Sequence, residues 1–218
     1  MDQQDQSRAD LDWREGAIPV SRRFDDPYFS LNGGLEETRH VFLAGNDLPA
    51  RLRPGFHVAE LGFGTGLNLL ALAQVATVPV RFTSFEAFPM SGDELARAHA
   101  AFPELADLAA QLRAGWPARR FTVGQVSAEV IEADARTALP AWAGRADAWF
   151  LDGFSPARNP ELWGEDLMAE VAAHTAPGGS FATYTAAGHV RRALAAAGFA
   201  VTRRPGFAGK RHMSRGQL

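Results

Sequence analysis

The sequence predicts an α/β fold in which the strands of a parallel sheet alternate with helices, behind an N-terminal β-rich cap. Three observations support this fold class. From residue 56 onward, short apolar runs alternate with helical patterns, as they do in parallel sheets. A glycine-rich turn directly follows the first of these runs, and several later runs end at a carboxylic acid. Both features are typical of Rossmann-like nucleotide-binding sheets.

The segment before this pattern carries turn signals between short β-like runs. Residues 18–53 contain Asp-Asp-Pro, Asn-Gly-Gly and Gly-Asn-Asp. We therefore expect a β-rich cap over residues 18–53 and a Rossmann-like core over residues 54–218, which together form one domain. The first ten residues are polar, and we expect residues 1–17 to be a disordered or frayed tail.

The first half of the core is expected to begin with two strands on either side of a helix. Residues 56–61 form a short apolar strand, residues 67–75 form a helix that is nearly continuously apolar, and residues 80–86 form the second strand. The Ala- and Leu-rich stretch 92–112 predicts a helix interrupted near Pro103 and closed by Trp116-Pro117. Residues 121–123 and 126–131 predict a strand pair or one interrupted strand.

The second half of the core is expected to begin with a strongly apolar buried strand at residues 146–151. A loop rich in Pro, Gly and Asn then leads to a helix at residues 163–174. After a turn at residues 177–179, we expect a strand at 180–184, a helix at 188–197, and edge strands around 199–203 and 212–213.

The composition is that of a soluble globular chain, with 46% hydrophobic and 22% charged residues. No apolar run approaches the ~20 residues that a membrane helix needs, so we expect no membrane association. The chain has no cysteine, which excludes disulfides, thiolate metal sites and thiol nucleophiles. These features favour a cytoplasmic protein.

The formal net charge of −3 gives no overall attraction to nucleic acid, so a polyanion would need a local basic patch. One stretch near the C-terminus has seven basic residues and no acidic residue. By charge alone it is a phosphate-binding patch or a solvated face. The seven are Arg191, Arg192, Arg203, Arg204, Lys210, Arg211 and Arg215, of which Lys210 is the only lysine in the chain.

The sharpest local motif is ELGFGTG at residues 60–66, where a strand ends in an acid and a glycine turn opens a helix. A dinucleotide fingerprint would need a third glycine at position 67, which is Leu67. An acid at the strand end suits the positively charged S-adenosylmethionine better than a pyrophosphate. Glu86 ends the second strand, where an acid binds ribose hydroxyls, and Asp134 is placed to accept from an adenine amino group. The alternative is that such acids simply face solvent.

Asp152 follows the apolar strand 146–151, and ligands of open α/β sheets bind just outside such strand ends. An amine must be neutral to attack a sulfonium methyl group, and Asp152 can orient its N–H groups and accept a proton. The following Phe154-Ser155-Pro156 is similar in kind to the acid-Pro-Pro-aromatic loops of amino methyltransferases. The alternative is that Asp152 caps a turn. Because the chain lacks cysteine, we expect direct transfer to nitrogen or oxygen, and its histidines have no metal-ligand spacing, so we expect no metal.

Longer motifs between residues 18 and 213 resemble the methyltransferase module of MnmC and its stand-alone form MnmD, a family of tRNA 5-aminomethyl-2-thiouridine methyltransferases. They are FDDPYFS (24–30), GLEETR (34–39), VFL (41–43), GNDL (45–48), ELGFGTGLN (60–68), FEAFP (85–89), DAWFLDGFSPARNPELW (147–163), GHVRRAL (188–194) and GFAGKRHM (206–213).

The resemblance implies a class I methyltransferase that converts 5-aminomethyl-(2-thio)uridine at the tRNA wobble position to 5-methylaminomethyl-(2-thio)uridine. It implies Asp152 as the catalytic residue. The implied cofactor-binding residues are Glu60, Gly62, Phe63, Gly64, Gly66, Asn68, Glu86, Asp134 and Ala135. The implied substrate-binding residues are Phe154, Pro156, Asn159, Pro160, Trp163, Lys210 and Arg211.

The resemblance also implies the cofactor S-adenosylmethionine, the partner tRNA, and no flavin in this chain. Two-domain members of the family continue into a flavin-dependent oxidase, so we expect a separate oxidase to supply the aminomethyl substrate. One position departs from the family, because His212 stands where a glutamate is usual. Three alternatives remain at this stage: a methyltransferase for a small-molecule amine, a nucleotide- or tRNA-binding module without turnover, and a nicotinamide oxidoreductase.

Overall fold

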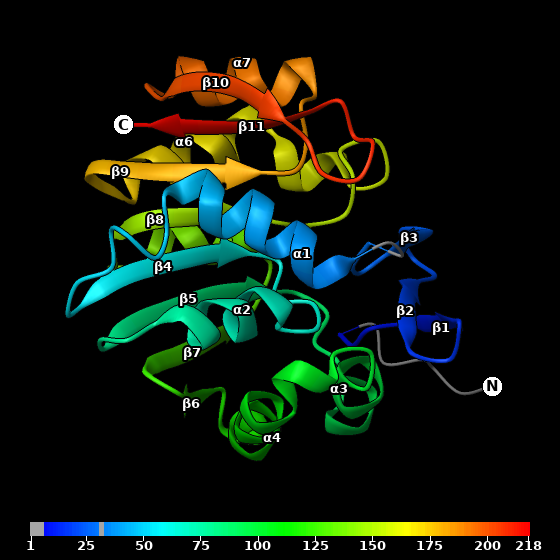
Figure 1. The fold of residues 1–218 in the computed structure, drawn as a ribbon. Helices are drawn as coiled ribbons and strands as arrows, with labels where there is room; N and C mark the ends of the chain where they lie inside the picture. Colours follow the sequence, from blue (N-terminus) through cyan, green and yellow to red (C-terminus); the bar gives the residue numbers. More distant parts are fainter. Residues whose placement is uncertain (1–6, 31–32) are drawn as a thin grey trace.

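An eight-stranded sheet lies at the centre of the computed structural model, which describes residues 7–30 and 33–218 (Figure 1). Its strands are β4 (Phe56–Leu61), β5 (Val80–Glu86), β6 (Arg120–Val123), β7 (Val126–Glu132), β8 (Ala146–Leu151), β9 (Thr175–Thr183), β10 (Ala200–Pro205) and β11 (His212–Gln217). Their order is β10-β11-β9-β8-β4-β5-β7-β6. The five strands from β9 to β7 in this order run parallel, whereas β6 and β11 are antiparallel to their neighbours. The predicted α/β class is confirmed.

Helices cover both faces of this sheet (Figure 1). They are α2 (Leu67–Val75), α3 (Gly92–His99), α4 (Ala106–Gly115), α5 (Ala135–Ala138), α6 (Glu165–Ala173) and α7 (Gly188–Ala196), with short 3₁₀ turns η3 (Pro103–Leu105), η4 (Trp116–Ala118), η5 (Leu139–Ala141) and η6 (Pro160–Trp163). One apolar cluster packs α2 and α4 against one face, with Leu70 and Phe150 fully buried. A second cluster packs α6 and α7 against the other face around Trp149 and Phe181. Alternate residues of each strand therefore enter opposite clusters.

The strand predictions need two corrections, and one open choice is resolved. Residues 120–123 and 126–132 form an antiparallel pair, which settles one of the two options that the sequence left open. The expected turn at 177–179 lies inside β9, which starts at Thr175 and is irregular between its pairings with Ala146 and Ala148. The segment 212–217 is not an edge strand, because β11 lies between β9 and β10 and buries Met213 and Ser214. Only β10 has a free edge at that side of the sheet.

The N-terminal segment forms a separate three-stranded antiparallel sheet of β1 (Leu11–Arg14), β2 (Ile18–Ser21) and β3 (Asp26–Pro27). The expected frayed tail is therefore wrong for residues 11–14, which pair with β2 and place Trp13 beneath the guanidinium of Arg97. Residues 1–6 of that expected tail lie outside the described residues. The small sheet stands beside the carboxyl ends of the central strands (Figure 1).

The cap prediction is wrong for residues 34–46, which are helical: α1 (Gly34–Thr38), a π-helical turn η1 (Arg39–Leu43) and a 3₁₀ turn η2 (Ala44–Asn46). Leu35 and Phe42 are seven residues apart, a helical spacing, and both are buried against the sheet. Gly33 lies in a turn, as expected, and precedes α1 in the left-handed conformation.

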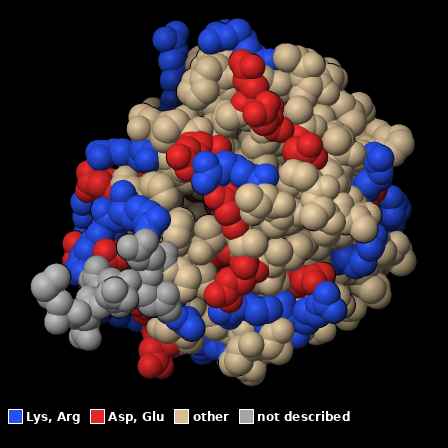
Figure 2. Space-filling view, turned by 180° about the vertical axis from the view of Figure 1, so that it is seen from behind, with Lys and Arg blue, Asp and Glu red and all other residues tan. Residues whose placement is uncertain are grey.

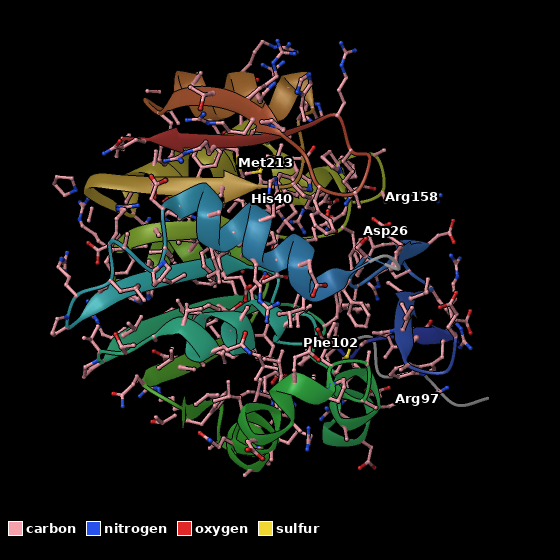
Figure 3. All side chains as sticks on the ribbon, viewed as in Figure 1. Asp26, His40, Arg97, Phe102, Arg158 and Met213 are labelled. Carbon is pink, nitrogen blue, oxygen red and sulfur yellow. The ribbon has the colours of Figure 1, made fainter. Side chains whose placement is uncertain are left out.

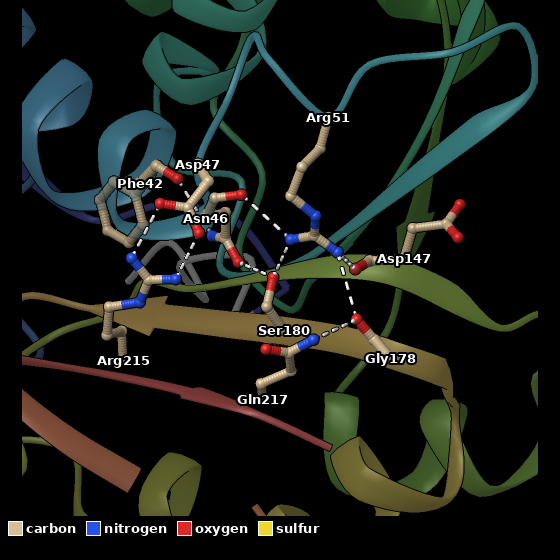
Figure 4. A network of polar contacts seen from close by, with 9 residues as sticks. All are labelled: Phe42, Asn46, Asp47, Arg51, Asp147, Gly178, Ser180, Arg215 and Gln217. Atoms are coloured by element: carbon tan, nitrogen blue, oxygen red, sulfur yellow. Dashed lines mark hydrogen bonds and ion pairs between the residues drawn. The ribbon is translucent and has the colours of Figure 1, made fainter. Parts of the chain in front are cut away.

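A polar network fastens the end of this helical segment to the sheet (Figure 4). Asn46 is fully buried; its amide nitrogen donates to the carbonyl oxygens of Phe42 and Trp149, and its amide oxygen accepts from Ser180 Oγ at 2.6 Å. Asp47 binds the guanidinium of Arg215 on β11. The segment that includes α1 is thereby fixed over β8, β9 and β11, beside the site described next.

Candidate active site

The carboxyl ends of β4, β5, β7 and β8 meet at one edge of the sheet, at the point where the strand order reverses. From β4 the chain proceeds outward to β5 and β7 and then returns to β8 on the other side of β4. Such a reversal leaves a crevice at the strand ends, where open α/β sheets bind ligands. A cavity of about 710 Å³ lies here, closed on its outer side by residues of the N-terminal segment and α1.

The glycine turn after β4 has three residues with positive φ: Gly62 (85°), Gly64 (54°) and Gly66 (74°). A Cβ on Gly62 would lie 2.5 Å from the carbonyl oxygen of Asp152, so this glycine lets the loops after β4 and β8 touch. A Cβ on Gly66 would lie 2.7 Å from the ring of Phe63. Gly62, Phe63 and Gly64 line the cavity, whereas Gly66 serves the packing at the start of α2.

Glu86 lies at the end of β5 and lines the cavity beside the glycine turn. Its carboxylate accepts hydrogen bonds from the backbone N–H groups of Gly64 (2.9 Å) and Phe88 (2.7 Å). Burial raises its pKa, against the opposing effect of these N–H donors. The acid that the sequence assigned to ribose binding thus also holds the glycine turn in place. Its contact with ribose stays a prediction.

Asp134 and Ala135 line the cavity at the start of α5, as expected. The Asp134 carboxylate caps this helix by accepting from the N–H of Arg136 at 2.9 Å. The Arg136 guanidinium binds the same carboxylate, which lowers the pKa of Asp134, and lies 2.7 Å from Glu161 Oε2. The expected acceptor for an adenine amino group is therefore already engaged by an arginine, a contact that the sequence did not reveal.

Asp152 and Glu60 are joined through the side-chain amide of Asn68. The amide nitrogen donates to Glu60 Oε1 and to Asp152 Oδ2, both at 2.8 Å, and the amide oxygen accepts from Thr38 Oγ1 at 3.0 Å. Glu60 Oε2 accepts from the hydroxyl of Ser84, its register partner on β5, at 2.6 Å. Glu60 is fully buried and is not among the residues that line the cavity, so it reaches the cavity through Asn68.

The surroundings of Asp152 and Glu60 raise the pKa of both carboxyl groups. Burial raises the pKa of Asp152 to about 7, although the hydrogen bond from Asn68 acts in the opposite direction. Burial also raises the pKa of Glu60 well above its usual range. A carboxylate with a pKa near neutrality is suited to accept a proton in one step and release it to solvent afterwards.

The loop after β8 is held by residues of the N-terminal segment. The ring of Phe154 stacks on Phe24 with centroids 4.7 Å apart and meets Tyr28 edge to face at 4.9 Å. The N–H of Ser155 donates to Asp26 Oδ2 at 2.8 Å, and Figure 3 places Asp26 near Arg158 at the carboxyl end of the sheet. The turn between β2 and β3 and the residue after β3 thus supply aromatic rings on the expected substrate side.

The other expected substrate residues divide into two groups. Asn159, Pro160 and Lys210 line the cavity, whereas Pro156, Trp163 and Arg211 do not. Trp163 is buried and its indole N–H donates to the carbonyl oxygen of Phe154 at 2.9 Å, so it supports the loop from behind. Arg211 lines a shallow hollow at the edge of the sheet with Arg203, Arg204 and His212.

Tyr184 and Glu37 are among the cavity residues that were assigned no role from the sequence. Tyr184, at the end of β9, donates its hydroxyl to the carbonyl oxygen of Gly153 at 2.7 Å. Glu37, on α1, pairs with Lys210 Nζ at 2.5 Å. Glu37 stands inside the GLEETR motif, which was the available signal, but only the folded position of α1 brings it to the cavity.

Two of the seven basic side chains near the C-terminus form ion pairs with acidic side chains. Arg215 pairs with Asp47, and Lys210 pairs with Glu37. Over the face seen in Figure 2, acidic and basic side chains are interspersed. Within residues 7–30 and 33–218, no group of three or more His, Cys, Asp and Glu side chains is arranged to hold a metal ion, and no helix is long and apolar enough to cross a membrane.

Comparison with known proteins identifies similar sequences. Residues 103–218 match the profile of the S-adenosyl-L-methionine-dependent methyltransferases. A tRNA 5-methylaminomethyl-2-thiouridine biosynthesis bifunctional protein MnmC from Caulobacter sp. (strain K31) is 47% identical over 95% of this chain and 38% of its own length. The protein of the same name from Caulobacter vibrioides is 47% identical over 92% of this chain and 36% of its own length. The chain therefore spans less than two fifths of these relatives.

Solved structures agree with this similarity. The crystal structure of MNMC2 from Aquifex aeolicus superposes with a TM-score of 0.75 and 25% identity, covering 99% of this chain and 72% of that chain. TrmN from Thermus thermophilus superposes with a TM-score of 0.52 at 23% identity, covering 92% of this chain and 53% of that chain, which supports the fold alone.

Proposed function

Because the chain belongs to the S-adenosyl-L-methionine-dependent methyltransferase family, we propose that it methylates the aminomethyl group of 5-aminomethyl-(2-thio)uridine at the tRNA wobble position, giving 5-methylaminomethyl-(2-thio)uridine. The substrate is inferred from relatives that are 47% identical over nearly the whole chain and are named for 5-methylaminomethyl-2-thiouridine biosynthesis.

The observation that carries the proposal is the position of Asp152. Asp152 is a half-buried residue that lines the cavity directly after β8, beside the glycine turn and the ring of Phe154. The same cavity is lined by the predicted cofactor residues Gly64 and Glu86 and by the predicted substrate residues Phe154, Asn159 and Lys210. A base in a cavity that can hold both reactants is what transfer of a group to an amine requires.

The residues present fit S-adenosylmethionine. The positive-φ turn at Gly62 and Gly64 keeps side chains out of the cavity beside α2, and Glu86 offers a carboxylate at the end of the second core strand. After β7, Asp134 offers a carboxylate as hydrogen-bond acceptor, and Ala135 is a small buried residue. When bound, this cofactor would supply an electrophilic methyl group.

The contribution of the chain itself concerns the amine. A primary ammonium carries no lone pair, so the substrate must lose a proton before its nitrogen can accept a methyl group. Asp152, with its pKa raised to about 7, would accept that proton while Asn68 holds its carboxylate in place. Phe154, fixed between Phe24 and Tyr28, would stack against the uracil ring and aim the aminomethyl group.

The proposal includes tRNA as partner and the cytoplasm as the site of the reaction. It also includes a flavin-dependent oxidase activity that prepares the aminomethyl group. We further propose that methyl transfer itself needs neither a metal ion nor a flavin.

The test is methyl transfer from labelled S-adenosylmethionine to tRNA that carries 5-aminomethyluridine, followed by nucleoside analysis of the product. Unmodified tRNA is the matched control. A labelled 5-methylaminomethyl nucleoside from the first tRNA only is expected. Methylation of small amines with no transfer to either tRNA would instead establish a small-molecule methyltransferase.

A further inference from the structure

We propose that Glu37 and Tyr184 form a binding site for a primary alkylammonium group, and that Lys210 occupies this site when substrate is absent. The inference rests on the proposed function, since the substrate is itself an aminomethyl compound. It adds a recognition site for the charged form of that substrate, distinct from the base Asp152.

The site consists of a carboxylate and an aromatic ring that both contact one ammonium group. Lys210 Nζ lies 2.5 Å from Glu37 Oε1 and 4.9 Å from the ring centroid of Tyr184. Both groups line the cavity that contains Asp152. Carboxylates and aromatic faces are the two protein groups that bind ammonium ions most effectively. The terminal CH₂–NH₃⁺ of a lysine has the same chemistry as a protonated aminomethyl substituent.

The two binding groups are anchored, and the lysine is not. Glu37 is 8% exposed, on the face of α1 that packs against the core. The Tyr184 hydroxyl donates to Gly153 O at 2.7 Å. By contrast, the Lys210 side chain is 47% exposed and comes from the connection between β10 and β11. Rotation of its own side-chain bonds is enough to move its ammonium into solvent, which would leave the site open.

The site is adjacent to the proposed base through two short chains of contacts. Thr38, the neighbour of Glu37, donates to the amide of Asn68, which in turn binds Asp152. The Tyr184 hydroxyl donates a hydrogen bond to the carbonyl oxygen of Gly153, the residue after Asp152. An ammonium held by Glu37 therefore enters the cavity next to the carboxylate that must deprotonate it.

Lys210 is the only lysine in the chain, which makes a direct test simple. In protein labelled with ¹³C-lysine, the ε-CH₂ group gives one signal, and the ring current of Tyr184 moves it away from the position of a solvated lysine. Addition of 5-aminomethyluridine is expected to return the signal to the solvated position. 5-Methyluridine, which lacks the ammonium group, is the matched control and is expected to leave it unchanged.

Two variants complete the test. Lys210→Met removes the competing ammonium, so 5-aminomethyluridine is expected to bind about tenfold more tightly than to the wild type. In Glu37→Gln the lysine signal is expected at the solvated position from the start, and the preference for 5-aminomethyluridine over 5-methyluridine is expected to be lost.

The alternative is that the Lys210–Glu37 ion pair permanently holds the β10–β11 connection in place. In that case Lys210→Met will bind 5-aminomethyluridine no better than the wild type or more weakly, and the lysine signal of the wild type will not move. That result, with tRNA methylation intact, would overturn the ammonium site and leave the proposed function standing. Displacement of Lys210 without methylation of the tRNA would support the site and refute the function.

Discussion

Asn68 Nδ2 lies 2.8 Å from Asp152 Oδ2, so a hydrogen bond joins the first turn of α2 to the acid that follows β8. The same nitrogen donates to Glu60 Oε1 at 2.8 Å. A primary amide has two N–H groups, and here both are used by carboxyl oxygens. Asn68 therefore fixes the position of the Asp152 carboxyl group in the cavity relative to the buried Glu60 of β4.

Replacement of Asn68 by Ala is expected to destabilise the protein by about 1–3 kcal/mol, because Glu60 and Asp152 lose a buried donor. We also expect turnover to fall by about tenfold, since the Asp152 carboxylate is no longer oriented. Urea unfolding and steady-state methylation measure the two effects. Thr38→Val, which removes only the donor to the amide oxygen, should give a smaller loss of both. Equal losses in the two variants would contradict this account.

Replacement of Asp152 by Asn is expected to lower turnover by roughly 10²-fold or more while cofactor affinity changes by only a few-fold. The asparagine carbonyl can still accept from Asn68, so the network is kept and only the base is removed. Methylation in a single turnover gives the rate, and calorimetry with S-adenosylhomocysteine gives the affinity. Unchanged turnover would remove Asp152 from the mechanism.

The pH dependence follows from the raised pKa of Asp152, about 7. The base acts as the carboxylate, so activity is expected to be low when the group is protonated below its pKa and to rise as pH passes through about 7. A profile of kcat/KM against pH between 5.5 and 9 should therefore show an acid limb near 7. A limb near 4, the usual range of an aspartate, would mean that burial does not raise this pKa in solution.

The position of Asp152 could be predicted from sequence, because a strand of six apolar residues and the acid that follows it are local features. The role of Glu60 as a buried partner of Asn68 could not, because it depends on which face of β4 meets α2. Alternation along β4 places Glu60 on the same face as Val58, under α1 and α2. Knowledge of the sheet order was needed to see this.

Glu37 and Tyr184 were missed for a related reason. Residues 34–46 carry a helical spacing of apolar residues, but the glycine pair before them resembles a turn, so a β-rich cap was expected. Lys210 lies 173 residues from Glu37 in the sequence, and their contact arises only when the β10–β11 connection returns over α1. Local patterns do not contain such long-range pairings.

The adenine assignment of Asp134 predicts a difference between two cofactor products. S-adenosylhomocysteine has a 6-amino group that can donate to a carboxylate, whereas S-inosylhomocysteine has a carbonyl oxygen there. We expect the wild type to prefer the adenosyl compound by about tenfold and Asp134→Ala to lose this preference. Arg136→Ala, which removes the guanidinium from Asp134 without touching the carboxylate, is the control and should keep it. A preference that survives Asp134→Ala would assign adenine recognition elsewhere.

The last prediction concerns Gly62, whose φ is 85° and whose added Cβ would lie 2.5 Å from Asp152 O. Gly62→Ala is expected to be destabilised by about 2–4 kcal/mol, because the strained backbone and the clash with the β8 loop act together. Cofactor binding should weaken as well, since Gly64 belongs to the same turn and donates its N–H to Glu86.

Gly92→Ala is the matched control for this substitution, because Gly92 begins α3 and a Cβ there meets nothing within 4 Å. Its stability is expected to stay unchanged or to rise by about 0.5–1 kcal/mol. Thermal unfolding and binding of S-adenosylhomocysteine would be measured for both variants. If Gly62→Ala folded and bound as well as Gly92→Ala, the contact between the β4 and β8 loops could not be what positions Asp152 beside the cofactor turn.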